Sequence, residues 1–154
     1  MEGNVVSEER CIPAEPAAIF GLVADAARHH EIDGSGLVRD VKAGAPQKLG
    51  MGSTFGMSMK MGIGYSTVNT VIEYEEDRLI AWQTGFRGFL GKFVGGRIWR
   101  YELEPVEGGT LVRESWDISQ DHQRALLRHG PVAKQSGESI RKTLEKIEGI
   151  VTKG

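Results

Sequence analysis

The residues best suited to chemistry in this sequence are Glu114, Tyr101 and Arg97, which the strand pattern places on the same face of a predicted hairpin. A carboxylate that is buried without a partner costs several kcal/mol or takes up a proton. An inward Glu114 therefore needs Tyr101, Arg97 or a ligand group as its partner. A neutral Glu114 with a raised pKa could donate or accept a proton in a reaction; the alternatives are a structural hydrogen bond to Tyr101, or a register that leaves Glu114 near solvent.

The hairpin that positions these residues is the best-defined part of the predicted sheet. Gly108 and Gly109 mark a turn between strands at residues 97–105 and 110–119. The side chains alternate consistently across this turn in one register, which sets Leu103 opposite Val112, Tyr101 opposite Glu114, and Trp99 opposite Trp116. The opposite face should be mostly solvated, and it carries Ile98, Arg100, Glu102, Arg113 and Asp117.

A second group of inward side chains is suited to binding an apolar molecule. Residues 55–61 alternate apolar and small or polar side chains, and residues 78–84 form a further strand centred on Trp82. The predicted ligand-binding residues are Met57, Met59, Trp82, Arg97, Trp99, Tyr101, Glu114 and Trp116. Methionine adapts to irregular shapes and aromatic rings offer broad apolar surface, so these residues could line a cavity. The alternative is that they fill an ordinary core.

A long amphipathic helix at residues 132–151 is expected to cover the inner face of this sheet. Its apolar positions recur at steps of three or four, and they are Ala133, Gly137, Ile140, Leu144, Ile147 and Val151. No other segment is helical over a comparable length, so the partner of this stripe must be a sheet. Between such a helix and a curved sheet lies either a packed core or a cavity.

The first half of the chain predicts strands interrupted by two short helices. A strand at residues 5–12 ends at Pro13, and Pro16 then opens a short helix. Residues 25–30 form a second short helix or turn, and strands follow at 37–42 and 65–75. Gly62, Ile63 and Gly64 are interpreted as a turn.

A glycine-rich stretch at residues 85–93 carries four large apolar side chains that would be costly to leave in water. They are Phe86, Phe89, Leu90 and Phe93. This segment could be a mobile gate over the cavity, a tip that touches a membrane, or a dimer contact. The alternative is a plain hairpin packed against its neighbours.

Composition and the remaining motifs exclude several classes of function. The chain has 154 residues, a net charge of -2 and one cysteine, Cys11, so we expect one domain over residues 1–154, no disulfide, and no attraction to nucleic acid. No signal peptide and no membrane-spanning run are predicted, which favours a cytoplasmic protein. His29 and His30, near Glu31 and Asp33, are interpreted as a solvated turn rather than a metal site, and no cofactor is expected.

The order of elements resembles the START-like or Bet v 1-like (SRPBCC) superfamily, and several motifs resemble its bacterial polyketide cyclase/dehydrase and lipid transport group. The motifs are residues 13–20, Asp25, the turn at residues 33–36, and residues 99–105 leading into Gly108-Gly109-Thr110. The resemblance covers nearly the whole chain. It implies an α+β helix-grip fold, in which a curved seven-stranded antiparallel sheet surrounds a long C-terminal helix, with two short helices after the first strand and a hydrophobic cavity between helix and sheet.

Three functions are compatible with this resemblance, because fold does not fix function. The favoured one is binding of a lipid, isoprenoid or polyketide-like molecule in the cavity, by a monomer or homodimer acting as carrier or sensor. The second is a metal-free cyclase or dehydratase that uses Glu114, Tyr101 and Arg97; its predicted lining is sparse in polar groups compared with cyclases of the superfamily. The third is a module that contacts a protein or membrane through residues 86–93.

Overall fold

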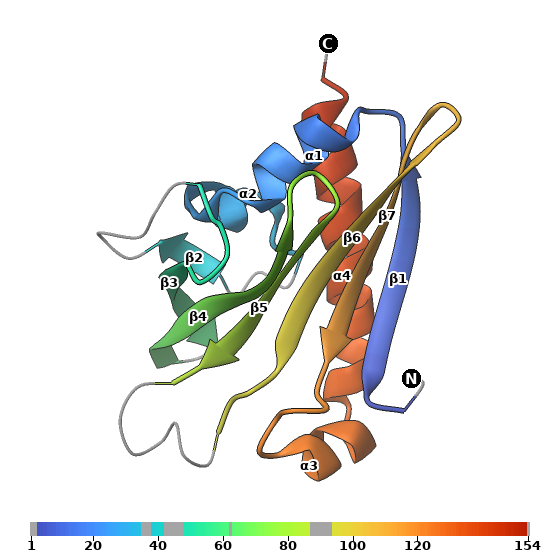
Figure 1. Ribbon diagram of the computed structural model, residues 1–154. Helices are drawn as coiled ribbons and strands as arrows, with labels where there is room; N and C mark the ends of the chain where they lie inside the picture. The colour runs from blue at the N-terminus through green and yellow to red at the C-terminus, as the bar shows by residue number, and fades with distance from the viewer. Residues whose placement is uncertain (1–2, 35–37, 42–47, 62, 87–93, 154) are drawn as a thin grey trace.

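A computed structural model describes residues 3–34, 38–41, 48–61, 63–86 and 94–153 (Figure 1). The strands are β1 (Val5–Ile12), β2 (Val38–Val41), β3 (Thr54–Met61), β4 (Ile63–Glu75), β5 (Leu79–Gly85), β6 (Ile98–Val106) and β7 (Gly109–Asp117). The helices are α1 (Pro16–Val23), the 3-10 helix η1 (Ala26–Arg28), α2 (His29–Ile32), α3 (Arg124–His129) and α4 (Val132–Val151). The strands form one sheet in the order β1-β7-β6-β5-β4-β3-β2, with antiparallel neighbours. The predicted α+β class, antiparallel sheet and long C-terminal helix are thereby confirmed.

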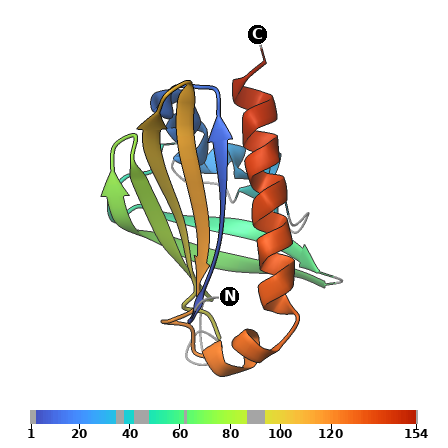
Figure 2. The same ribbon diagram turned by 90° about the vertical axis from the view of Figure 1, so that its right-hand side faces the viewer.

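Helix α4 lies along one face of the sheet, beside β1, while β3 and β4 bend away from the other strands (Figure 2). Its bounds match the predicted range, and Gly137, Ile140, Leu144 and Ile147 are buried as the stripe requires. Ser136 and Thr143 are buried too, so the contact face is wider than the apolar stripe alone. Burying each large aliphatic side chain contributes about 1.5–3 kcal/mol, which fixes this face of α4 toward the sheet.

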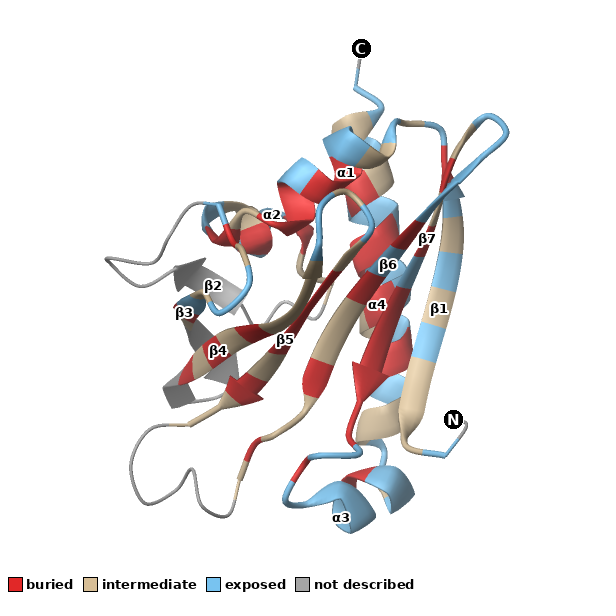
Figure 3. Ribbon diagram, viewed as in Figure 1, coloured by how far each residue is buried: buried red, intermediate tan, exposed pale blue. Residues whose placement is uncertain are grey.

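The core lies between α4, the short helices and the inner face of the sheet (Figure 3). Strands β5, β6 and β7 contribute alternate residues to it, as expected for a sheet with one buried face. Helix α1 begins at Pro16, whose fixed φ suits a first helical position, and it buries Ile19, Phe20, Leu22 and Val23. These short helices close one end of the inner face (Figure 1).

Strand β4 has apolar residues in both of its alternating sets, so the sequence does not decide which set faces inward. The pairing with β5 shifts between Val71 and Glu73, so one extra residue is inserted there and the alternation changes phase. Val71 lies opposite Trp82 before this bulge, and Tyr74 lies opposite Ile80 after it. Apolar residues consequently occur in both alternating sets of the strand.

Two details differ from the predicted elements. Strand β3 continues to Met61 and β4 begins at Ile63, so Ile63 belongs to a strand and the predicted turn is shorter. Helix α3 was not predicted, because Leu127 is its only buried residue and the segment lacks an apolar stripe. Among helices of the described residues, none is both long and apolar enough to span a membrane.

Candidate functional site

The register of the β6–β7 hairpin is the predicted one. Tyr101 pairs with Glu114, Leu103 with Val112, and Trp99 with Trp116. Two constraints require glycine here: the turn gives Gly108 a φ of 86°, and the end of β1 lies so close that a Cβ on Gly109 would overlap the carbonyl group of Ile12. The turn therefore fixes the register, and the register sets Tyr101 and Glu114 side by side on the inner face.

Glu114 is a buried carboxyl group with a strongly perturbed pKa. Its exposed fraction is 3%, and burial raises the pKa to about 8, although a hydrogen bond with Tyr101 acts in the opposite direction. The charge of Asp33 raises it further. Burial and the neighbouring carboxyl also raise the pKa of Tyr101 well above its ordinary value. At neutral pH both groups are therefore mainly protonated, and Glu114 can act as a proton donor.

One oxygen of this carboxyl group, Glu114 Oε1, is buried and has no hydrogen-bond partner in the part of the chain that the structure describes. An unpartnered buried polar atom costs about 1–3 kcal/mol. Such atoms often indicate where a water molecule or a ligand group binds.

Trp82 connects this hairpin to an array of aromatic rings. Its centroid lies 5.7 Å from that of Tyr101, and the imidazole of His29 stacks on it at 4.9 Å with an interplanar angle of 21°. Phe55 meets both rings edge-on, at 5.5 Å from Trp82 and 5.3 Å from His29. Edge-to-face and offset-stacked rings hold each other in defined orientations. The array thus forms a rigid aromatic wall beside Tyr101.

His29 corrects the prediction that the His29-His30 pair forms a solvated turn. His30 is exposed, but His29 is 4% exposed and its Nε2 lies 2.7 Å from the carbonyl oxygen of Val23. Burial lowers the pKa of His29 to about 4, so the ring is neutral at physiological pH. Since Nε2 donates to a carbonyl, Nδ1 carries the lone pair. Like Glu114 Oε1, this Nδ1 is buried without a partner among the described residues.

A periodic signal for the burial of His29 exists in the sequence. Val23, Ala26, His29 and Ile32 recur at steps of three, and all four are buried. A histidine that continues an apolar series is itself expected to be inside.

The end of α2 joins these groups to α4. Gly34 N donates to Thr143 Oγ1 at 2.9 Å, and a Cβ on Gly34 would overlap backbone atoms of α4. Lys146 Nζ donates to the carbonyl oxygen of Asp33 at 2.8 Å. The charge of Asp33 raises the pKa values of Glu114, Tyr101 and His29 alike. One carboxylate is therefore within electrostatic reach of all three.

Arg97 lies elsewhere. It precedes the first residue of β6, and its Nε donates to Oδ2 of the fully buried Asp121 at 3.3 Å. The other oxygen of Asp121 accepts from the backbone N–H of Gln123 at 2.8 Å. Arg97 thus anchors the segment before α3 and is not the partner of Glu114.

The other predicted ligand-binding residues are placed only in part. Trp116 is buried and Trp99 is half-buried on the inner face. Met57 and Met59 belong to β3, but their side chains lie outside the described residues. Of the predicted gate, Phe86 is half-buried, whereas Phe89, Leu90 and Phe93 fall outside the described part of the chain.

The inner face carries a second polar cluster, around Asn69, that the sequence pattern does not predict. Thr84 Oγ1 donates to Asn69 Oδ1 at 2.7 Å, and Asn69 Nδ2 donates to the carbonyl oxygen of Phe55 at 3.3 Å and to Thr67 Oγ1 at 3.2 Å. These groups satisfy one another, as buried polar side chains in a structural network do. The unmet hydrogen-bonding capacity lies instead at Glu114 and His29.

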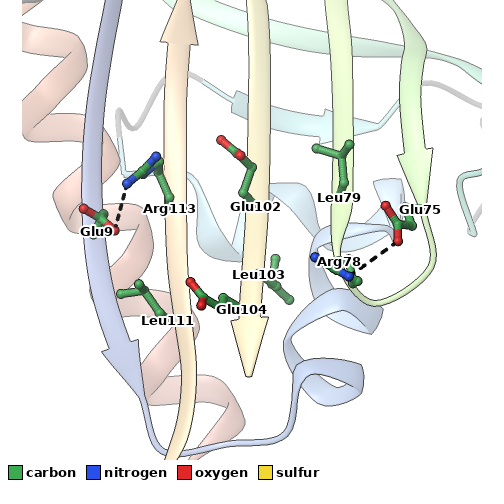
Figure 4. A pocket seen from close by; sticks show the side chains of 9 residues that line it. All are labelled: Glu9, Glu75, Arg78, Leu79, Glu102, Leu103, Glu104, Leu111 and Arg113. Carbon is green, nitrogen blue, oxygen red and sulfur yellow. Dashed lines mark ion pairs between the residues drawn. The ribbon is translucent and has the colours of Figure 1, made fainter. Parts of the chain in front are cut away.

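The outer face carries an open depression of about 320 Å³ (Figure 4). Its lining is mostly charged and consists of Glu9, Glu75, Arg78, Leu79, Glu102, Leu103, Glu104, Leu111 and Arg113. Two ion pairs cross it, Arg113–Glu9 at 3.3 Å and Arg78–Glu75 at 3.8 Å. Neither Glu114 nor His29 lines it, so this hollow and the perturbed groups lie on different faces. Within the described residues no cluster of three or more metal-ligating side chains occurs.

Comparisons with known proteins identify relatives over nearly the whole chain. The profile of the family described as "Polyketide cyclase / dehydrase and lipid transport" matches residues 4–151. An uncharacterized protein of Mycobacterium tuberculosis (strain ATCC 25618 / H37Rv) is 31% identical over 159 residues, in a match that covers 97% of this chain and 65% of that protein. The chain therefore spans less than two thirds of the length of this relative.

Solved structures share the fold at low identity. A protein from Arthrobacter aurescens has a TM-score of 0.72 and 13% identity, with 99% of this chain and 88% of that chain covered. The Aha1 dimer from Colwellia psychrerythraea has a TM-score of 0.68 and 18% identity, with 97% of each chain covered. At these identities the likeness establishes the fold alone.

Proposed function

Because the chain belongs to the polyketide cyclase/dehydrase and lipid transport family, we propose that it binds a hydrophobic or amphipathic small molecule between α4 and the inner face of the sheet, as a carrier or sensor. The observation that carries this proposal is the pair of buried polar atoms without partners, Glu114 Oε1 and His29 Nδ1. They belong to side chains at the two ends of the array formed by His29, Trp82, Tyr101 and Glu114. Apolar walls with a few convergent polar groups are typical of ligand sites.

Native mass spectrometry of the purified chain, followed by extraction of whatever copurifies, tests this proposal. We expect a bound lipid, isoprenoid or aromatic compound, and a rise in melting temperature when that compound is added back. Trp82→Leu should weaken its binding at least about tenfold by removing the central ring of the wall. Glu102→Gln, on the exposed outer face, is the matched control and should bind normally.

A clean apo protein that no hydrophobic probe stabilises would contradict ligand binding. It would indicate that the same side chains fill a core. Thermal unfolding of Trp82→Leu is measured alongside, so that a loss of binding is counted only for a folded variant.

Proton-transfer chemistry of the cyclase or dehydratase type is the second candidate, and the state of Glu114 favours it. A carboxyl group whose pKa is about 8 is protonated at neutral pH and lies close to the range in which general acids and bases work best. In this candidate function Glu114→Gln abolishes turnover of a bound substrate while leaving its affinity largely intact. Turnover that survives in Glu114→Gln would remove the catalytic role.

A contact with a protein or membrane through residues 86–93 remains a prediction, as does assembly as a monomer or homodimer. Phe86 is the one member of the predicted gate that the structure describes. The Colwellia psychrerythraea neighbour is a dimer, which makes a homodimer of this chain a proposal worth testing by sedimentation.

A further inference from the structure

Helix α3 projects from one end of the molecule and turns most of its surface toward solvent (Figure 1, Figure 3). Leu127 is its only buried residue. Leu126, by contrast, is 70% exposed. A single exposed leucine is common on protein surfaces, so its surroundings decide what it means.

The surroundings of Leu126 are positively charged. Residues 122–137 contain Arg124, Arg128 and Lys134 but no aspartate or glutamate. All three cations are exposed, and none forms an ion pair with a described residue. Arg124 and Arg128 are neighbours on α3 because they lie four residues apart, and Lys134 belongs to the first turn of α4, which packs against α3. This end of the molecule therefore combines three free positive charges with an exposed aliphatic side chain.

The opposite end of the molecule is acidic. The β4–β5 and β6–β7 turns lie there (Figure 1), and Asp77, Glu104 and Glu107 belong to these turns or to the strand end beside them. None of these three carboxylates forms an ion pair within the described part of the chain. The small net charge of -2 thus hides a separation of charge between the two ends. Such a separation turns the α3 end toward a negatively charged surface.

The composition of the α3 end favours a lipid surface over a protein or a nucleic acid. Residues 122–137 contain no phenylalanine, tryptophan or tyrosine. Tryptophan and tyrosine anchor many protein interfaces, and aromatic rings stack on single-stranded bases. A membrane surface needs no such anchors, because its anionic headgroups attract arginine and lysine while the layer beneath them accepts an aliphatic side chain. A helix at a projecting end can also meet a flat surface without obstruction from the sheet (Figure 2).

We propose that α3 and the first turn of α4 form a docking surface for anionic membranes, in which Arg124, Arg128 and Lys134 contact the headgroups and Leu126 inserts below them. Docking of this kind is peripheral and reversible, because three cations and one leucine bind far more weakly than a membrane-spanning helix. The docking surface lies on the exterior, so it acts whether or not the interior binds a small molecule.

Cosedimentation of the whole chain with lipid vesicles tests this proposal. Vesicles of phosphatidylcholine are compared with vesicles that hold equal amounts of phosphatidylcholine and phosphatidylserine, at low ionic strength. We expect the chain to bind the anionic vesicles at least about tenfold more tightly, and we expect about 0.5 M NaCl to abolish the difference. Anionic vesicles that bind no better than neutral ones would overturn the proposal.

Variants of α3 locate the docking surface. Arg124→Gln combined with Arg128→Gln should lower the affinity for anionic vesicles about thirtyfold, since each cation near such a surface accounts for about fivefold. Leu126→Ser should lower it about fivefold, because a partly inserted leucine would be lost. All of these side chains are exposed, so the variants should fold, and circular dichroism verifies this.

Lys142→Gln combined with Lys153→Gln is the matched control, because it removes two exposed cations that lie further along α4 and beyond its end. This variant should bind anionic vesicles nearly as well as the unaltered chain. An equal loss in both double variants would mean that overall charge drives binding, and it would overturn the proposed site. Binding to poly-L-glutamate without binding to vesicles would overturn the lipid partner and assign the surface to an acidic protein.

Discussion

Burial moves the pKa values of two interior residues in opposite directions, because it penalises whichever form is charged. Glu114 is held protonated, with a pKa near 8 in place of 4.5, and His29 is held neutral, with a pKa near 4 in place of 6.5. Neither has an opposite charge at hydrogen-bonding distance among the contacts described. The interior therefore tolerates two titratable groups at neutral pH only because both are uncharged there.

The free energy of unfolding should consequently vary with pH in a defined way. Between about 4.5 and 8 the folded chain retains a proton on Glu114 that the unfolded chain releases, so this residue stabilises the fold below 4.5 and its contribution is lost as the pH rises to 8. Between about 4 and 6.5 the unfolded chain protonates His29 and the folded chain does not, so stability rises with pH. The two effects offset each other up to pH 6.5, and above it Glu114 dominates, with a loss of up to about 1.4 kcal/mol per pH unit.

Urea unfolding followed by tryptophan fluorescence across this pH range measures the effect in single variants. Glu114→Gln should remove the decline above pH 6.5 and expose the rise between about 4 and 6.5. His29→Gln should instead make the decline begin near pH 4.5. Glu102→Gln, exposed on the outer face, should follow the unaltered protein. A decline above pH 6.5 that persists in Glu114→Gln would assign it to another group.

At the scale of elements, the sequence predicts well what depends on regular periodicity. Helix α4 has its predicted bounds because apolar residues recur at helical spacing over its whole length. The β6–β7 register follows from a glycine turn of fixed length and from side chains that alternate on both strands. The sequence alone therefore predicts that Tyr101 pairs with Glu114.

Features that depend on tertiary contacts or on breaks in periodicity could not be predicted in the same way. Arg97 continues the alternation of the predicted strand, but β6 begins one residue after it, at Ile98, and the buried Asp121 binds its side chain. The bulge after Val71 changes the phase of β4 within one strand. His29 is buried because short helices close the end of the sheet, and its partner is a backbone carbonyl, which leaves no trace in side-chain patterns.

The molecule as a whole places its charged network around Arg100 and its buried, uncharged titratable group Glu114 on opposite faces of one sheet. On the outer face Arg100 bonds Glu73 through Nε at 2.7 Å and Asp117 through Nη1 at 3.4 Å. On the inner face the polar atoms are either mutually satisfied, as around Asn69, or unpartnered, as at Glu114. Helix α4 creates this difference, since it is the long element that shields the inner face from water (Figure 2).

The integrity of the inner face should therefore depend on the buried side of α4. Ile140 is 0% exposed, so Ile140→Asp forces a carboxylate into the contact between helix and sheet. We expect the free energy of unfolding to fall by more than about 4 kcal/mol, which is comparable with the total stability of many domains. Circular dichroism with thermal or urea unfolding should show no cooperative transition for this variant. Ile140→Val, which only shortens the side chain, should cost about 0.5–1.5 kcal/mol. Lys142→Asp, on the exposed side of the same helix, should change stability by no more than about 0.5 kcal/mol. A cooperative Ile140→Asp variant with near-normal stability would mean that a different face of α4 covers the sheet.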